Sequence, residues 1–225
     1  TDKTKVIMYS SPNNPTGTVY SEAELRALAA VIEKHPSIFV LSDEIYEYIN
    51  FIGQHESIAQ FSSIKERVVV INGLSKGFAM TGWRLGYAVW PESLVAHVTR
   101  LCINDHSCVN ASAQFAGLAA LTGPQDAVAE MMVAFNQRRR LIVEALNSLP
   151  GVRCSDAAGA FYAFPHVGGT GLTSRQAQDL FLNEAGVATI SGTSFGAWGE
   201  GYVRFSYANS AENIERAIER IRKVL

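Results

Sequence analysis

Residues 67–87 read RVVVINGLSKGFAMTGWRLGY, and they place one lysine, Lys76, just after a short apolar run. An apolar run of this length is typical of a buried strand, and the residues that follow it lie at the edge of a sheet. The next charged residue is Arg84, so Lys76 lacks the charged neighbours of a solvated helix face. Lys76 is therefore either an exposed loop lysine or a nucleophile whose amine forms a Schiff base with a carbonyl compound.

Two earlier segments follow the same pattern and indicate the fold. Residues 6–9 form an apolar run that enters a polar loop, and residues 38–46, IFVLSDEIY, turn polar by Asp43. Between them, Ser21 and Glu24 form a capping box in front of a helical pattern. Strands that alternate with a helix predict an α/β fold with a mostly parallel sheet. In such a sheet, ligands bind at the carboxyl ends of the strands.

The later part of the chain has a different pattern. Residues 127–149 carry a long helical pattern, and after them short strand-like runs alternate with a helix near 174–184 and a final amphipathic helix. We predict three parts: the later portion of a large α/β domain in residues 1–125, a connecting helix in 126–150, and a smaller α+β domain in 151–225.

Composition excludes several classes of partner. The chain has 225 residues, 48% hydrophobic and 18% charged, with a formal net charge of −2. Its basic residues are scattered, which argues against a nucleic-acid or membrane surface. The cysteines, Cys102, Cys108 and Cys154, have neither the pairing of a disulfide framework nor the spacing of a zinc site, so we expect no metal and a reducing cytoplasm. No apolar stretch is long enough to span a membrane.

Residues near the predicted strand ends could serve a cofactor attached to Lys76. If that cofactor is pyridoxal phosphate, its pyridinium nitrogen needs a carboxylate, which Asp43 offers. Tyr46 could donate its hydroxyl to the ring oxygen, and Arg84 could bind the phosphate through two parallel hydrogen bonds. Each residue also has a structural interpretation: a helix cap or turn for Asp43, aromatic packing for Tyr46, and a surface strand residue in an ion pair for Arg84.

Two further residues stand in informative surroundings. Asn14 lies in PNNPTG, a turn by composition, and a cis bond to the next proline would hold it in an unusual orientation. Arg204 lies between apolar neighbours in YVRFSYA, so it is either a solvent-side strand residue or a receptor for a carboxylate. By themselves, these residues indicate a ligand-binding α/β enzyme that could form a lysine Schiff base.

Taken together, the motifs show a family resemblance. The chain resembles the class I/II aminotransferases of the aspartate aminotransferase family, which are pyridoxal-phosphate enzymes of fold type I, with the N-terminal part of the family missing. The motifs that carry the resemblance span nearly the whole chain and occur in the family's order: PNNPTG, SDEIY, NGLSKGFAMTGWRLGY, GAFYAFP and GEGYVRFSYA. The third is long enough to be highly specific. The resemblance implies a partial large domain of fold type I followed by a small domain.

The resemblance also implies a role for each candidate residue. Lys76 would form the Schiff base with pyridoxal phosphate and carry out the proton shift. The cofactor would further be held by Asp43 at the pyridinium nitrogen, Tyr46 and Asn14 at the ring oxygen, and Arg84 at the phosphate, with Ser75 as a further contact. The substrate α-carboxylate would be bound by Arg204, with Asn14 beside the substrate.

The implied activity is transamination between an L-amino acid and a 2-oxo acid, in amino-acid metabolism and biosynthesis. The NGxxK form resembles the aspartate/prephenate subgroup, so an aspartate-type substrate is one expectation. A homodimer with shared active sites is another. Three alternatives stay open: another fold-type I reaction such as β-elimination or decarboxylation, the sensor domain of a transcription regulator, and an inactive fragment with half a cofactor site.

Overall fold

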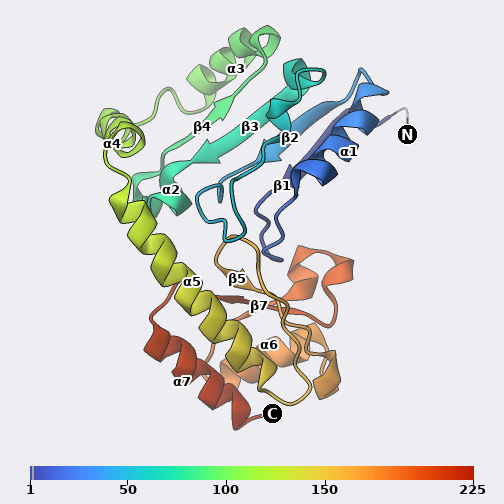
Figure 1. Cartoon of the computed structure of the whole chain (residues 1–225), viewed down its shortest axis with the longest axis vertical. Coiled ribbons are helices and arrows are strands. Elements are labelled where there is room, and N and C mark those ends of the chain that lie inside the picture. The colour runs from blue at the N-terminus through green and yellow to red at the C-terminus, as the bar shows by residue number, and fades with distance from the viewer. Residues whose placement is uncertain (2) are drawn as a thin grey trace. The chain divides into compact units, whose positions relative to one another are not determined.

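The chain forms two compact units in the computed structural model, which describes residue 1 and residues 3–225 (Figure 1). The first unit comprises Thr1–Pro12 and Val19–Val128, and the second comprises Asn13–Thr18 and Ala129–Leu225. A short loop near the N-terminus therefore belongs with the later half of the chain. The three-part division at residues 125 and 150 stays a proposal.

A four-stranded sheet forms the centre of the first unit. Its strands lie side by side in the order β1–β2–β3–β4, with bounds Val6–Ser10, Phe39–Asp43, Val68–Gly73 and Gly86–Val89 (Figure 1). β1, β2 and β3 are parallel, and β4 is antiparallel to β3. This arrangement confirms the predicted α/β fold with a mostly parallel sheet.

Helix α1, Glu22–Glu33, connects β1 to β2 and packs on the core of this unit. It begins at the predicted capping box, in which Ser21 accepts from the Glu24 amide and the Glu24 carboxylate accepts from the Ser21 amide. Leu25 and Ile32 on its inner face are fully buried among strand residues such as Val40. Burying each such side chain contributes about 1.5–3 kcal/mol, which keeps the helix on the sheet and aligns the strand ends.

Three further helices complete the first unit: α2, Leu74–Gly77; α3, Glu92–Asp105; and α4, Ala111–Thr122. The sequence pattern did not predict α4. Its segment, ASAQFAGLAALT, consists mainly of small and apolar residues, and its few polar residues do not leave a single hydrophobic face to mark a helix. Phe115 and Leu118 on α4 are 74% and 58% exposed. Short 3₁₀ turns lie at Ile58–Gln60, Lys65–Arg67 and Thr81–Trp83.

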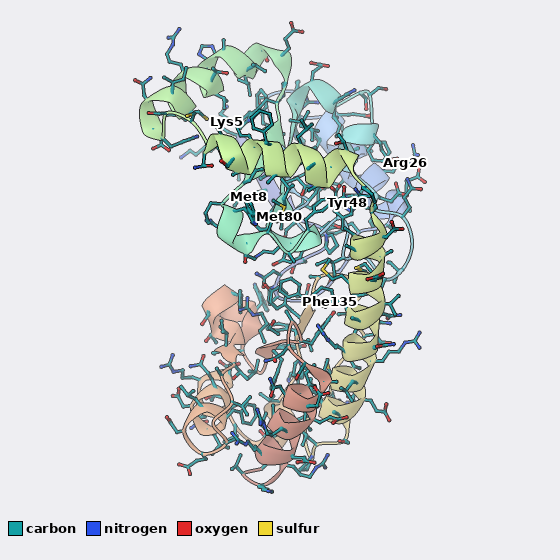
Figure 2. The ribbon with its side chains drawn as sticks, turned by 90° about the vertical axis from the view of Figure 1, so that its left-hand side faces the viewer. Lys5, Met8, Arg26, Tyr48, Met80 and Phe135 are labelled. Atoms are coloured by element: carbon teal, nitrogen blue, oxygen red, sulfur yellow. The ribbon has the colours of Figure 1, made fainter. Side chains whose placement is uncertain are left out.

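The second unit packs the long helix α5, Asp126–Asn147, against a small antiparallel sheet. The strands, in the order β5–β7–β6, are Tyr162–Ala163, Val203–Ser206 and Ile190–Ser191. Phe135 on α5, which is labelled in Figure 2, stacks on Phe161 with 5.6 Å between ring centroids. The strands are much shorter than the predicted strand-like runs: only two to four residues of each run pair with a neighbouring strand.

Two more helices belong to this unit: α6, Ser174–Asn183, and α7, Ala211–Arg222. Both confirm the predicted helices, and α7 buries Ile214, Ile218 and Ile221 on its apolar face. Further 3₁₀ turns lie at Gly168–Thr170, Gly192–Phe195 and Ala197–Gly199. Among the residues that the structure describes, no helix combines the length and apolarity needed to cross a membrane.

Candidate active site

The carboxyl ends of β2 and β3 form the edge at which most of the candidate residues lie. β2 ends at Asp43, which pairs with Ile71 of β3, and the next amide, that of Glu44, donates to the Ile71 carbonyl at 2.8 Å. β3 continues directly into α2, which carries Ser75 and Lys76. Since the two strands are parallel and in register, Asp43 and Lys76 follow neighbouring strand ends at the same edge of the sheet.

The two segments that leave this edge pack directly against each other. A Cβ atom at Gly77 would come within 2.6 Å of the Tyr48 ring, and one at Gly73 would lie 3.1 Å from the Ile45 side chain. The ring of Tyr48 (labelled in Figure 2) also meets Phe78 edge-on, with centroids 4.9 Å apart. The turn that carries Tyr46 is therefore the immediate neighbour of the turn that carries Lys76.

Asp43 and Tyr46 also make the contacts expected of a turn aspartate and a packing tyrosine. One carboxylate oxygen of Asp43 accepts from the Ile45 amide at 3.2 Å, as expected for a turn aspartate. Tyr46 is 4% exposed, as expected for a packing tyrosine, and its carbonyl accepts from the Ile49 amide at 2.7 Å. These contacts hold both residues in a defined turn, which is also what a ligand-binding role requires.

Arg84 lies before β4 and not within a strand, which removes the surface-strand interpretation. It has a left-handed backbone, with φ of +53°, and its guanidinium donates to the Thr81 carbonyl at 3.0 Å. It is exposed and lines a pocket of about 700 Å³ together with Trp83 and His106. The Leu74 amide donates to the Leu85 carbonyl at 3.3 Å, so the segments that carry Arg84 and Lys76 are adjacent. Ser75 and Lys76 are both half-buried.

The second unit brings Asn14 and Arg204 together across 190 residues of sequence. The Arg204 guanidinium donates to the Asn14 side-chain oxygen at 2.8 Å. It also lies over two aromatic rings, 4.5 Å from the Tyr162 centroid and 5.0 Å from the Phe195 centroid. Such contacts stabilise a cation when it is partly desolvated. Arg204 is half-buried, and the Asn14–Pro15 bond is cis.

The loop of residues 13–18 is held by the segment that contains the GAFY motif. The Gly17 carbonyl accepts from the Ala158 and Gly159 amides, both at 2.9 Å. Gly17 has φ of +69°, and a Cβ there would lie 2.6 Å from the Ala157 side chain. Arg139 of α5 donates to the Ala157 carbonyl at 3.1 Å. Close packing of these two segments therefore fixes the loop that presents Asn14.

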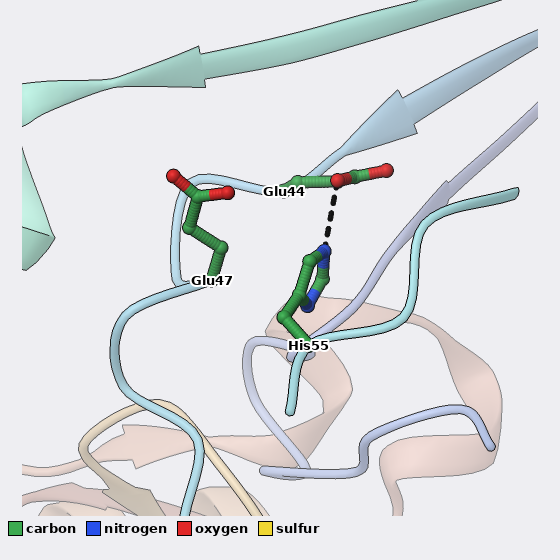
Figure 3. A group of neighbouring side chains, drawn as sticks. All are labelled: Glu44, Glu47 and His55. Atoms are coloured by element: carbon green, nitrogen blue, oxygen red, sulfur yellow. Dashed lines mark hydrogen bonds and ion pairs between the residues drawn. The ribbon is translucent and has the colours of Figure 1, made fainter. Parts of the chain in front are cut away.

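A buried polar cluster beside Asp43 was not predicted from the sequence. The Glu44 side chain is 4% exposed, and its carboxylate accepts from Ser42 at 2.8 Å and Ser57 at 2.7 Å. Its other oxygen lies 2.8 Å from Nε2 of His55 (Figure 3). The available signal was the spacing of Ser42 and Glu44, since residues two apart in an extended segment share a side. The bonds of Glu44 to Ser57 and His55 join distant residues and left no local signal.

Burial changes the acid–base properties of groups near this cluster. Desolvation raises the pKa of Glu47, and the nearby His55 and a hydrogen bond from Asn72 oppose that rise. Burial also raises the pKa of Tyr9 to about 12, and the Tyr9 and Ser42 hydroxyl oxygens lie 3.0 Å apart. Ligand atoms of Glu44, Glu47 and His55 lie within 4.8 Å of one another, a donor set that could hold a metal ion.

Comparison with known proteins decides the family. The model of the family described as aminotransferase class I and II matches residues 1–221. The chain belongs to this family. Among its curated aminotransferase relatives, the aspartate aminotransferase of Pyrococcus abyssi is 40% identical over 228 residues. The aromatic-amino-acid aminotransferase 2 of Thermococcus litoralis is also 40% identical over 228 residues. Each match covers 100% of this chain and 58% of the relative.

Solved aminotransferase structures agree with the fold. The aromatic aminotransferase from Pyrococcus horikoshii superposes with a TM-score of 0.96 at 40% identity and covers 100% of this chain and 60% of that chain. The aspartate aminotransferase from Rhizobium meliloti gives a TM-score of 0.94 at 36% identity and covers 100% and 58%. These neighbours confirm a fold-type I architecture for the chain, which spans about 58% of the length of the curated relatives.

Proposed function

We propose that the native protein catalyses pyridoxal-phosphate-dependent transamination between an L-amino acid and a 2-oxo acid. One observation carries the proposal: in a member of the aminotransferase family, the turns that carry Tyr46 and Lys76 pack against each other where neighbouring strands end. A sheet edge of this kind is where open α/β folds bind ligands. The chain spans about 58% of the length of its relatives, so the proposal concerns the whole native protein and not this chain by itself.

The side chains at this edge fit pyridoxal phosphate by their chemistry. The cofactor offers an aldehyde, a ring nitrogen, a ring hydroxyl and a phosphate. The first unit supplies an amine in Lys76, a carboxylate in Asp43, a phenol in Tyr46 and a guanidinium in Arg84. Ser75 adds a hydroxyl next to Lys76 that could contact the phosphate. When bound, pyridoxal phosphate supplies an electron sink for the carbon that loses its proton.

Each residue would act through an ordinary property of its side chain. The carboxylate of Asp43 would hold a proton on the ring nitrogen, because an opposite charge favours the protonated form. Tyr46 would donate a hydrogen bond to the ring oxygen, and Arg84 would bind the phosphate with charge-assisted bonds. The Nζ amine of Lys76 would attach the cofactor and, when freed, would move the proton from the substrate Cα.

Arg204 and Asn14 would bind the substrate. A guanidinium matches the planar geometry of a carboxylate with two parallel donors, and this recognition suits any α-amino acid. The rings of Tyr162 and Phe195 restrict the guanidinium to one orientation. Asn14, already bonded to Arg204, would take part in binding the substrate and the ring oxygen.

The test is to add pyridoxal phosphate to the native protein and record the visible absorbance of the lysine-bound cofactor. We expect the band in the unchanged protein, its loss in Lys76→Ala, and its retention in Lys65→Ala, a control at an exposed lysine of the same unit. An identical band in Lys76→Ala would sink the assignment. Product analysis then separates transamination, which moves the amino group to an acceptor 2-oxo acid, from β-elimination, which releases pyruvate, ammonia and a leaving group.

The substrate, the assembly and the location are parts of the same proposal. The names of the relatives include aspartate and aromatic amino acids, so both types belong in the substrate panel, with aspartate expected first. We propose a cytoplasmic homodimer with shared active sites. Exposed apolar side chains on α3 and α4, among them Leu101 and Phe115, support the dimer. The three free cysteines support the cytoplasmic location. Scattering of the native protein measures its mass, and a monomer would contradict the dimer.

A further inference from the structure

We propose that Glu44, through its bonds to His55 and Ser57, is a positioning residue that fixes the turn carrying Asp43 and Tyr46. This inference rests on the proposed function, because it concerns how the protein holds two of its candidate cofactor contacts. It is based on the burial and the hydrogen bonds of the Glu44 carboxylate.

The Glu44 carboxylate is buried, and both of its oxygens have hydrogen-bond partners. Its side chain is 4% exposed, and three side chains, Ser42, Ser57 and His55, lie at 2.7–2.8 Å from its oxygens. A buried carboxylate is tolerated only when donors replace its lost hydration. Breaking such a network leaves a desolvated charge behind, so the arrangement strongly favours one conformation of the segment.

The network closes a loop around Tyr46. Glu44 lies 11 residues before His55 and 13 before Ser57, and its bonds tie the start of the loop to its end (Figure 3). Backbone bonds complete the turn inside: the Glu47 amide donates to the Glu44 carbonyl at 2.9 Å, and the Ile49 amide to the Tyr46 carbonyl at 2.7 Å. Tyr46 belongs to this segment in sequence, and its side chain is buried.

Alternation along the strand end places Asp43 on the other side from the network. Side chains two residues apart in extended chain share a face, and the Ser42–Glu44 bond at 2.8 Å shows that these two do. Asp43 lies between them and belongs to the opposite face. Anchoring Glu44 therefore helps to orient Asp43 without a bond to the Asp43 carboxylate, one oxygen of which accepts only from the Ile45 amide of the same turn.

A metal ion is the competing use of the same side chains, since Glu44, Glu47 and His55 could together hold one. The hydrogen bonds favour the anchor. Glu44 already accepts from two serines and lies 2.8 Å from His55, and Glu47 is paired with Asn72. An ion would have to displace the His55–Glu44 bond. Zinc binding is therefore one outcome that the experiment must detect.

The experiment compares Glu44→Gln with Glu66→Gln, a matched change at an exposed glutamate of the same unit. Glutamine keeps the size of the side chain, and its amide oxygen can still accept from Ser42 and Ser57. Its uncharged amide NH₂ group replaces the oxygen that faces His55. We expect the Kd for pyridoxal phosphate to rise about tenfold in Glu44→Gln, in line with the loss of a charge-assisted hydrogen bond. In the cofactor-free protein, the Glu47 and Ile49 amides should exchange hydrogen about tenfold faster. Glu66→Gln should change neither value.

The amides of α1 distinguish a local effect from a general loss of stability. In a local effect, the exchange of the α1 amides should change only as much as the free energy of unfolding of the variant predicts. An unchanged Kd or unchanged exchange at Glu47 and Ile49 in folded Glu44→Gln overturns the proposal. Zinc binding would also overturn the proposal. In this outcome, zinc added alone binds stoichiometrically to the unchanged protein and does not bind to Glu44→Gln. If Glu44→Gln does not fold, His55→Gln and Ser57→Ala, which each remove one partner, decide by the same two readouts.

Failure of this inference is distinct from failure of the proposed function. If the unchanged protein shows no lysine-bound cofactor absorbance, the proposed function fails, whatever Glu44→Gln does to amide exchange. If the absorbance appears and depends on Lys76 but the Glu44→Gln readouts stay unchanged, only the positioning role fails.

Discussion

The two units hold their candidate residues by different means. In the first unit, Asp43 and Lys76 follow the ends of paired parallel strands, and the ladder between β2 and β3 sets their places. In the second unit, Arg204 is oriented by side chains: two aromatic rings and the amide of Asn14. Backbone topology positions the first set, and packing positions the second. Small changes in packing should therefore matter more in the second unit.

The two units should therefore respond differently to changes that disturb the positions of their candidate residues. Many backbone bonds hold a strand end, so no single side chain within β2 or β3 decides its place, and the proposed role of Glu44 concerns the turn that follows β2. The Arg204 arrangement depends on the loop of residues 13–18, which is held through a few close contacts at Gly17.

Gly17→Ala should lower the free energy of unfolding by about 2–4 kcal/mol, because a left-handed backbone strains alanine and the new methyl overlaps its surroundings. A Cβ at Gly17 would lie 2.6 Å from the Ala157 side chain. The control is Gly171→Ala: φ is +80° there, but nothing lies within 4 Å of the added atom. Its loss should be about 1 kcal/mol. Urea unfolding measures both, and equal losses would show that packing at Gly17 is not decisive.

Arg204→Lys should raise the KM for an amino-acid substrate about 10- to 100-fold, because a lysine cannot form two parallel bonds to a carboxylate or stack between rings. The stability of the fold should change little, since the guanidinium is half-buried. Arg175→Lys, at an exposed arginine of α6, is the matched control and should leave KM unchanged. Steady-state kinetics decides, and an unaltered KM in Arg204→Lys would remove Arg204 from substrate binding.

The two capping boxes should respond differently to acid. At α6, Thr173 pairs with the neutral Gln176, so Thr173→Ala should cost about 1 kcal/mol at every pH. At α1, Ser21 pairs with Glu24, whose pKa is lowered by its bonds to the Ser21 side chain and amide. The stability that Glu24 contributes is present above its unfolded pKa, 4.5, and is lost as pH falls through the lower folded pKa.

The cost of Ser21→Ala should therefore shrink in acid, whereas that of Thr173→Ala should not. Amide exchange of α1 and α6 across this pH range measures both. A parallel response of the two helices would show that the Glu24 charge does not contribute to the cap.

Glu47→Gln should make stability less dependent on pH. Burial raises the pKa of Glu47 above 4.5, so the folded state holds the proton more tightly than the unfolded state. Stability therefore falls as pH rises from 4.5 through the folded pKa. Glutamine can still accept from Asn72 but carries no charge, so the variant should unfold at higher urea than the unchanged protein at neutral pH. An exposed control, Glu66→Gln, should show no such gain, and a lower midpoint in Glu47→Gln would contradict the assignment.

Local patterns were sufficient for much of the fold and part of the candidate site. The Ser21–Glu24 capping box, the strand that ends at Asp43 and the placement of Lys76 after β3 could all be predicted. Each depends on interactions between residues a few positions apart, such as a cap bond or the side-to-side alternation of a strand. The helix α4 could not be predicted in the same way, because its mainly small and apolar segment has no periodic signal.

Interactions between neighbouring residues were enough to predict most of the helices and strands, although not α4, and to predict which reactive side chains follow the strand ends. Only the tertiary structure decided that Asn14 bonds Arg204 and that the Glu44 carboxylate lies against His55. The chain path brings these partners together across 190 and 11 residues, and their bonds form only once burial has removed water. Sequence spacing carries no record of such contacts.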